Sequence, residues 1–169
     1  MKQVGHERKR KRSSGPEESS HVEKIISGGQ TGVDRAALEV ALELGIPCGG
    51  WCPKGRKAED GPIDPRYPLQ ETESTSYPVR TERNVKDSDG TLILTDGPAT
   101  GGTAATIKFA QKYKKPYLVI DLGLGGDPEI VRKWGQTNKI RILNVAGPRE
   151  NKSPGIHDRV VEFLRKMLH

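Results

Sequence analysis

The sequence predicts an α/β fold in three layers, with a doubly wound parallel sheet of about five strands, in a single domain over residues 21–169. Short apolar segments alternate with segments of helical character along most of the chain, which is typical of strands joined by right-handed helical crossovers. In addition, the segment 90–96 contains three consecutive apolar residues, Leu92, Ile93 and Leu94. Such a run indicates a strand that helices cover on both faces.

The first predicted unit is a strand, a glycine-rich loop and a helix. Residues 24–26 predict a short strand, and residues 36–44 have helical periodicity. Between them lies the sequence Gly28-Gly29-Gln30-Thr31-Gly32, which predicts a tight loop. Gly45 supplies the left-handed conformation that ends many helices, and residues 46–51 predict the second strand.

A long stretch without regular structure follows, from residue 53 to residue 77. Its four prolines and two glycines favour neither a long helix nor a long strand. Connections of this length within a compact domain usually have a function, and the aromatic residues in the stretch indicate that it packs against the rest. We expect it to lie over the site, with Lys54, Arg56 and Lys57 supplying positive charge.

The second half of the chain repeats the strand, loop and helix. The strand 90–96 leads into Gly97-Pro98-Ala99-Thr100-Gly101-Gly102-Thr103 and then into a helix at 104–113. The remaining predicted elements are a polar helix at 80–88, strands at 116–122 and 140–146, and helices at 128–135 and 156–168. The final helix is amphipathic, with Ile156, Val160 and Phe163 on one face.

The positive charge of the protein is concentrated at the N-terminus. Residues 1–12 contain six basic residues and one acidic residue, so they carry five of the six net positive charges. We expect residues 1–20 to be a disordered basic tail and any contact with nucleic acid to be confined to it. The nearly neutral remainder offers little counterion release on binding nucleic acid.

The cysteines and the hydropathy pattern indicate a cytoplasmic protein. Cys48 and Cys52 are too few for a disulfide framework and lack further nearby ligands for a metal, so buried thiols are expected. No apolar run reaches the about 20 residues of a membrane-spanning helix. The basic N-terminus also lacks the apolar region of a secretory signal.

Both glycine-rich loops are suited to an anion. Glycine lets the main chain approach a ligand closely, and the free N–H groups of a helical first turn favour negative charge. Such a loop therefore suits a phosphate or another anion. If the first and third strands are neighbours, the two loops face each other at the carboxyl edge of the sheet. Neither loop has the spacing of a dinucleotide-binding G-x-G-x-x-G motif or of a P-loop.

Several motifs in order along the chain resemble the "putative molybdenum carrier" family: SGGQTGVDR at 27–35, GGWCPKGRKAED at 49–60, Arg80-Thr81 with Arg83-Asn84-Val85, and TGGT at 100–103. The resemblance covers roughly residues 22–168. It implies a Rossmann-like fold, related to lysine-decarboxylase-like and "lonely guy" phosphoribohydrolase proteins. It also implies a homo-oligomer and a bound molybdenum cofactor, a pterin with a phosphate, or a similar nucleotide-like ligand.

The ligand is expected between the two phosphate-binding loops, without a direct protein site for a metal. The residues expected to bind it in the loops are Gly28, Gly29, Gln30, Thr31, Gly32, Thr100, Gly101, Gly102 and Thr103. Those expected around the loops are Asp34, Arg35, Lys54, Arg56, Arg83 and Asn84.

The related hydrolases have a P-G-G-x-G-T-x-x-E loop in which the Glu is catalytic. Aligning Gly102-Thr103 with the Gly-Thr of that motif places Thr106 at the Glu position. A neutral hydroxyl cannot replace a carboxylate as a base, which favours a carrier over an enzyme. A nucleotide-processing enzyme that takes a carboxylate from another loop, such as Asp34 or Glu59, is the alternative. A nucleic-acid-binding module is a third possibility.

Overall fold

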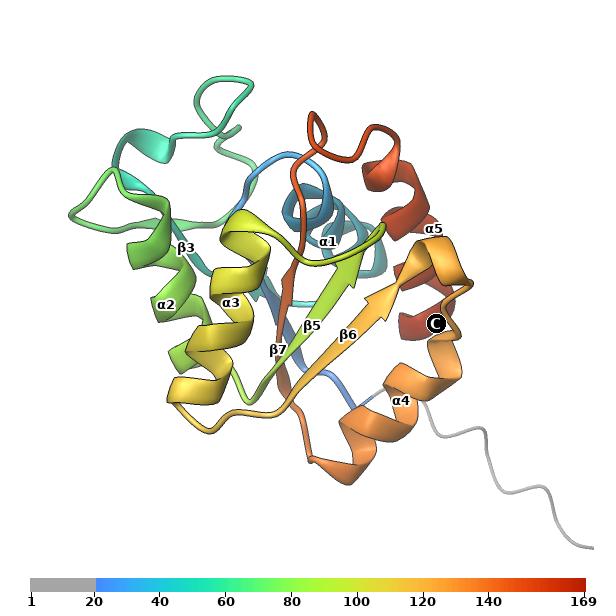
Figure 1. Ribbon diagram of the computed structural model, residues 1–169. Coiled ribbons are helices and arrows are strands. Elements are labelled where there is room, and N and C mark those ends of the chain that lie inside the picture. The colour runs from blue at the N-terminus through green and yellow to red at the C-terminus, as the bar shows by residue number, and fades with distance from the viewer. Residues whose placement is uncertain (1–20) are drawn as a thin grey trace, which may run out of the picture.

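The computed structural model describes residues 21–169 and contains a five-stranded parallel sheet between two layers of helices (Figure 1). The strands of this sheet are β1 (Lys24–Ile26), β2 (Cys48–Gly49), β5 (Gly90–Thr95), β6 (Tyr117–Asp121) and β7 (Ile142–Ala146). The helices are α1 (Val33–Leu44), α2 (Tyr77–Asp87), α3 (Gly101–Lys112), α4 (Pro128–Thr137) and α5 (Ile156–Leu168). The predicted three-layer α/β fold is confirmed. The predicted tail, 1–20, lies outside the described residues.

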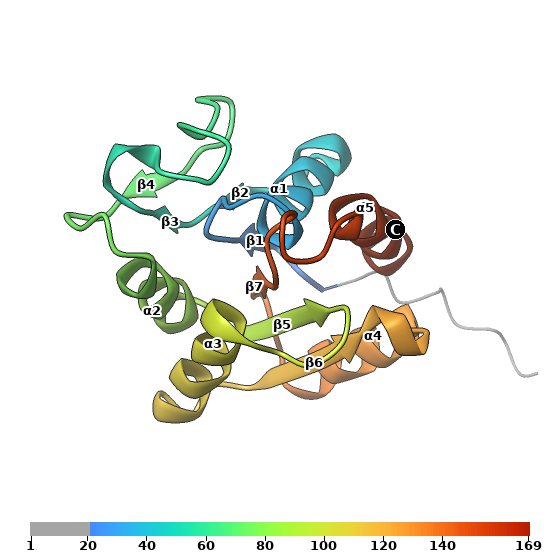
Figure 2. The ribbon, with the colours of Figure 1, turned by 45° about the horizontal axis from the view of Figure 1, so that its top comes forward.

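Helices α1, α4 and α5 pack together on one face of the sheet, and α2 and α3 cover the other (Figure 2). Leu92 and Leu94 of β5 belong to the core on the side of α1, α4 and α5. Ile93, between them, is equally buried but lies outside that cluster. The consecutive apolar residues of β5 are therefore explained by burial on both faces.

The strand order is β2-β1-β7-β5-β6, so the last strand in the sequence lies between β1 and β5. On one side Ile25 pairs with Leu143, and on the other side Ile93 pairs with Ala146. The condition considered above, that the first and third predicted strands are neighbours, is therefore not met. As a consequence, the segment that follows β7 emerges between the two glycine-rich loops.

The predicted second strand is divided at Gly50. β2 extends the main sheet, whereas β3 (Trp51–Cys52) pairs in parallel with β4 (Gln70–Glu71) in a separate two-stranded sheet. Gly50 has a φ of +122°, and a Cβ there would lie 2.4 Å from the carbonyl oxygen of Ser27. Only glycine allows the chain to turn away so close to β1.

Three helices begin three residues earlier than predicted, at Val33, Tyr77 and Gly101, whereas the bounds of α5 are confirmed. The first turn of a helix has no intrahelical acceptors for its N–H groups and tolerates glycine and proline, so its sequence does not look helical.

The long stretch 53–76 is packed, as predicted. It contains a short 3-10 helix, η1 (Lys54–Arg56), and its apolar side chains form a second, smaller core against Leu38 of α1. The members of this core are Leu38, Cys52, Ala58, Ile63, Tyr67 and Leu69. Among the described residues, no helix has both the length and the apolar character needed to cross a membrane.

Candidate functional site

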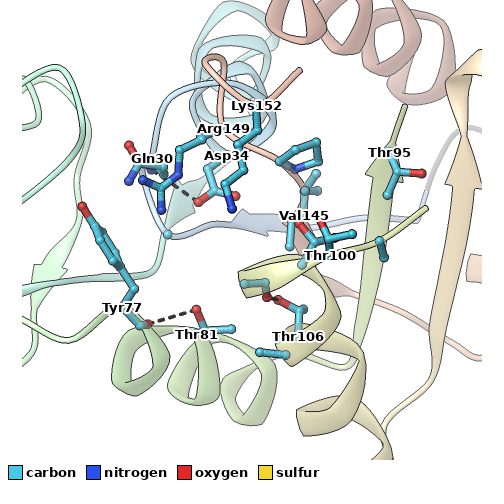
Figure 3. Close-up of a pocket in the computed structure, with 18 of the residues that line it drawn as sticks. Gln30, Asp34, Tyr77, Thr81, Thr95, Thr100, Thr106, Val145, Arg149 and Lys152 are labelled. Carbon is cyan, nitrogen blue, oxygen red and sulfur yellow. Dashed lines mark hydrogen bonds between the residues drawn. The ribbon is translucent and has the colours of Figure 1, made fainter. Parts of the chain in front are cut away.

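A cavity of about 210 Å³ lies at the carboxyl edge of the sheet (Figure 3). Its wall is formed by the loop after β1, the loop after β5 with the first turns of α3, the segment after β7, and one side of α2. In Figure 3, Arg149 and Lys152 from the segment after β7 lie near Asp34, across the cavity from Thr81 of α2 and Thr106 of α3.

The structure brings seven of the fifteen predicted site residues to this cavity. They are Gly28, Gln30, Asp34, Asn84, Thr100, Gly102 and Thr103. The other eight do not line it: Gly29, Thr31, Gly32, Arg35, Lys54, Arg56, Arg83 and Gly101. Of the predicted stretch 53–77, only Tyr77 lines the cavity, and it is the first residue of α2, so the expectation that this stretch lies over the site is wrong. It packs instead behind the first glycine-rich loop, where a Cβ at Gly29 would lie 2.5 Å from Leu69.

The predicted arginines outside the cavity have partners within the protein. Arg35 Nη1 lies 2.8 Å from a carboxylate oxygen of Asp60, and Arg83 lies 2.6 Å from Glu73. Arg56 donates to four main-chain carbonyls of its own loop, which braces that loop. The acceptors are the carbonyls of Ile63, Asp64, Tyr67 and Leu69.

Several main-chain N–H groups at the first glycine-rich loop also have acceptors within the protein. Four of them, from this loop and the start of α1, donate to acceptors within the protein, so they are not free to hold an anion. The bonds run from Gly29 to Ser27 Oγ, from Gln30 to Asp34 Oδ2, from Thr31 to Gln30 Oε1 and from Val33 to the carbonyl of Pro148. The carbonyl of Pro148 also fills the space beside Gly32, where a Cβ would lie 2.4 Å from it.

At the second glycine-rich loop, the N-terminus of α3 is exposed and has no side-chain cap. The N-cap residue Thr100 makes no capping hydrogen bond through its side chain. Its carbonyl accepts from Thr103 and Ala104, whereas the N–H groups of Gly101 and Gly102 have no acceptor within residues 21–169. Both glycines are exposed. This helix end therefore retains free donors and the positive end of its dipole.

Three cationic side chains line the cavity, and the sequence analysis did not select them: Arg80, Arg149 and Lys152. Arg80 and Arg149 each lie with the guanidinium carbon 5.3 Å from the centre of the Tyr77 ring. Arg149 and Lys152 form no ion pair and no side-chain hydrogen bond in the described part of the chain. The sequence feature that points to Arg149 and Lys152 is their position shortly after the fifth predicted strand, at its carboxyl end, where ligands bind in such sheets.

Asp34 is an acidic residue of the cavity wall that lies beside Arg80. Its carboxylate is nearly buried, accepts from the main-chain N–H of Gln30 at 3.3 Å and lies 3.7 Å from Arg80 Nη2. Burial raises the pKa of this carboxyl to about 6, although the charge of Arg80 acts in the opposite direction. Asp34 is therefore able to gain or lose a proton near neutral pH.

Buried side-chain polar atoms that lack a hydrogen-bond partner also belong to residues of this cavity. Within residues 21–169, three buried side-chain atoms lack a hydrogen-bond partner: Gln30 Nε2, Arg80 Nε and Thr95 Oγ1. All three residues line this cavity. Because buried polar groups are normally satisfied, their clustering indicates a place where a polar guest completes the hydrogen bonding.

Two further predictions concern Thr106 and the cysteines. Thr106 lines the cavity and donates to the carbonyl of Gly102 at 3.0 Å, so its hydroxyl is occupied in bracing α3.

Cys48 and Cys52 are free thiols whose pKa values are raised by burial. Among the described residues, no group of three or more His, Cys, Asp or Glu side chains is arranged to hold a metal ion.

A parallel sheet with helices on both faces and a cationic cavity at its carboxyl edge defines a Rossmann-like α/β protein. The circularly permutated YpsA SLOG family matches residues 25–168, and the chain belongs to this family. It is 47% identical to a "Putative molybdenum carrier protein" from Syntrophus aciditrophicus, whose crystal structure superimposes with a TM-score of 0.89. That similarity covers 92% of this chain and 100% of the other, which confirms the predicted resemblance. No curated protein matches the sequence.

Proposed function

We propose that this protein binds a small phosphate-bearing molecule, of molybdenum cofactor or nucleotide type, in the cavity at the carboxyl edge of its sheet. The observation that carries the proposal is the position of Lys152. A Cβ at Gly101 would lie only 3.1 Å from Lys152 Nζ, so the ammonium group lies beside the N-terminus of α3. A cation beside the positive end of a helix dipole is unfavourable without an anion, and no carboxylate in residues 21–169 pairs with it.

A phosphate at this position relieves the repulsion. It accepts from the free N–H groups of Gly101 and Gly102 and from Lys152, and it lies within the reach of the unpaired Arg149. The unpartnered atoms around the cavity supply further donors for the rest of the molecule. The anion is thus held by one glycine-rich loop and by the segment after β7, and the first loop forms the cavity wall.

The name of the similar protein from Syntrophus aciditrophicus supports a molybdenum-related ligand. The donor set fits the phosphate and ring of a pterin cofactor, and the metal of such a cofactor is carried by the pterin itself. We assign its phosphate to Lys152, Arg149 and the first turn of α3. A cytoplasmic location and a homo-oligomer stay predictions.

Titration calorimetry with molybdopterin, GMP, AMP and ribose 5-phosphate tests the proposal. At least one of these ligands is expected to saturate a single site, and Lys152→Ala is expected to weaken binding about tenfold or more, the value of a charge-assisted hydrogen bond. Lys166→Ala is the matched control, because Lys166 is an exposed lysine paired with Glu162 on α5. Absence of saturable binding to every ligand, or equal losses in the two variants, would refute the proposal.

A second candidate function is an enzyme that cleaves the N-glycosidic bond of a nucleotide. Asp34 favours it, because a cavity carboxyl whose pKa is raised to about 6 by burial is suited to acid–base catalysis. Release of free base from nucleoside monophosphates, abolished in Asp34→Asn, is the expected result. Binding without any release separates a carrier from this enzyme.

A further inference from the structure

The side-chain amide of Gln30 has a fixed orientation. Its Oε1 atom accepts from the main-chain N–H of Thr31 at 3.0 Å and from that of Glu59 at 2.9 Å. A flipped amide would place its NH2 group against these two donors, so Oε1 must face them. The Nε2 atom is consequently the free end, and it is one of the buried donors without a partner at the cavity.

Asp34 offers acceptors in the same cavity wall as this donor. The two residues are connected directly, because the main-chain N–H of Gln30 donates to Asp34 Oδ2. Arg80 approaches the same oxygen, at 3.7 Å. Oδ1 accepts no hydrogen bond within residues 21–169. An ionised carboxylate can accept about four hydrogen bonds, so this nearly buried group in the cavity wall has unused capacity.

One amide donor beside an under-coordinated carboxylate matches a particular ring edge. On the proposed function given above, we propose that Gln30 and Asp34 recognise a 2-amino-4-oxopyrimidine ring, the element that guanine and pterins share. The ring N–H and the exocyclic amino group donate to the carboxylate of Asp34. The adjacent ring carbonyl accepts from Nε2 of Gln30.

An adenine ring is rejected by the same arrangement. Its unprotonated ring nitrogen faces the carboxylate, and its amino group faces the donor of Gln30, so both contacts are mismatched. A site built from hydrogen-bonding groups discriminates strongly, because a wrong ring leaves buried polar groups unpaired. The phosphate is bound separately, at Lys152 and the first turn of α3.

The test is a panel of GMP, IMP, XMP, AMP and a pterin monophosphate, titrated at about pH 8, where Asp34 is ionised. The wild-type protein is expected to bind GMP and the pterin at least about tenfold more tightly than IMP, which lacks the amino group, and AMP. Whichever of GMP and the pterin monophosphate binds more tightly shows whether the ring belongs to a guanine nucleotide or to a pterin.

The decisive variant is Asp34→Asn. An asparagine amide accepts from the ring N–H but donates where the carboxylate accepted, so the preference is expected to change from GMP to XMP, which has a carbonyl in place of the amino group. Lys152→Ala is expected to weaken all nucleotides equally and leave their ratios unchanged. Thermal unfolding shows whether each variant is folded.

The two proposals fail in different ways. Equal affinity of the wild-type protein for GMP and AMP, or a uniform loss over the panel in Asp34→Asn, overturns the ring assignment while phosphate binding stands. If ribose 5-phosphate and all five ring-bearing ligands fail to bind, the proposed function fails and the ring assignment with it.

Discussion

Arg80 Nη2 lies 3.7 Å from Asp34 Oδ2 at the cavity wall, and both side chains are largely buried. The separation is too long for a hydrogen bond, so the carboxylate is only weakly compensated for its loss of water. Gly28 makes this position of Arg80 possible, because a Cβ there would lie 2.5 Å from Arg80 Nε. A buried guanidinium and an under-coordinated carboxylate are thus held together at the proposed ligand site.

This pair predicts a pH dependence of stability. Burial raises the pKa of Asp34 from 3.8 to about 6 in the folded protein, so the folded state binds its proton more tightly than the unfolded state. The stabilisation from this group is complete below about pH 4 and is lost as the pH rises through 6. Relative to Asp34→Asn, the wild-type protein is expected to lose about 3 kcal/mol across this window.

Urea unfolding of both proteins in steps from acid to neutral pH measures this difference. The asparagine variant provides the reference, because all other titrating groups are shared and cancel. The difference in unfolding free energy between the two proteins should grow up to about pH 6 and then stay constant. A difference that does not change with pH would show that the carboxyl is not perturbed.

Gly32 of the first loop and Gly45 at the end of α1 predict a contrast in stability. Gly32 and Gly45 both have a φ near +70°, at +77° and +69°. A Cβ at Gly45 meets nothing within 4 Å, whereas at Gly32 it would lie 2.4 Å from the carbonyl oxygen of Pro148. Gly45→Ala is therefore expected to lose about 1 kcal/mol through backbone strain alone. Gly32→Ala is expected to lose about 3 kcal/mol, because main-chain atoms cannot move aside.

Denaturant midpoints of the two alanine variants check this prediction. Similar losses at both positions would mean that the segment after β7 does not press against the first loop. The contrast matters for function, because the same contact explains why that loop has no room for an anion at the N-terminus of α1.

Gly102 allows a variant that separates binding from folding. It has no neighbour within 4 Å of an added Cβ and lies in the first turn of α3. Gly102→Asp is expected to retain or slightly raise the melting temperature, since an acidic residue at a helix N-terminus contributes about 0.3–1 kcal/mol. It should reduce affinity for phosphate-bearing ligands more than about tenfold, because its carboxylate repels the phosphate.

Calorimetry with the best ligand and a thermal melt measure the two effects on the same sample. Gly135→Asp is the control, because Gly135 of α4 also has free space around it and lies outside the cavity wall. Unchanged affinity in Gly102→Asp would place the phosphate away from α3.

Much of the fold follows from local patterns. The apolar run of β5, the left-handed Gly45 after α1 and the amphipathic α5 are each encoded within a few neighbouring residues. The starts of α1, α2 and α3 were predicted too late, because a first turn carries no periodic signal. The two glycine-rich loops were recognised as chemically equivalent from sequence, since both combine glycine with the start of a helix.

By itself, the sequence determined the α/β class, most of the helices and strands, and seven of the residues that line the cavity, because these depend on spacing over a few residues. The tertiary structure decided that β7 separates β1 from β5, that Arg149 and Lys152 reach the cavity, and that the N–H groups of Gly101 and Gly102 stay exposed without an acceptor in residues 21–169. Strand order is set by pairing between segments far apart in the chain. The N–H group of Val33 is occupied because the distant carbonyl of Pro148 packs against it, and no local pattern records that contact.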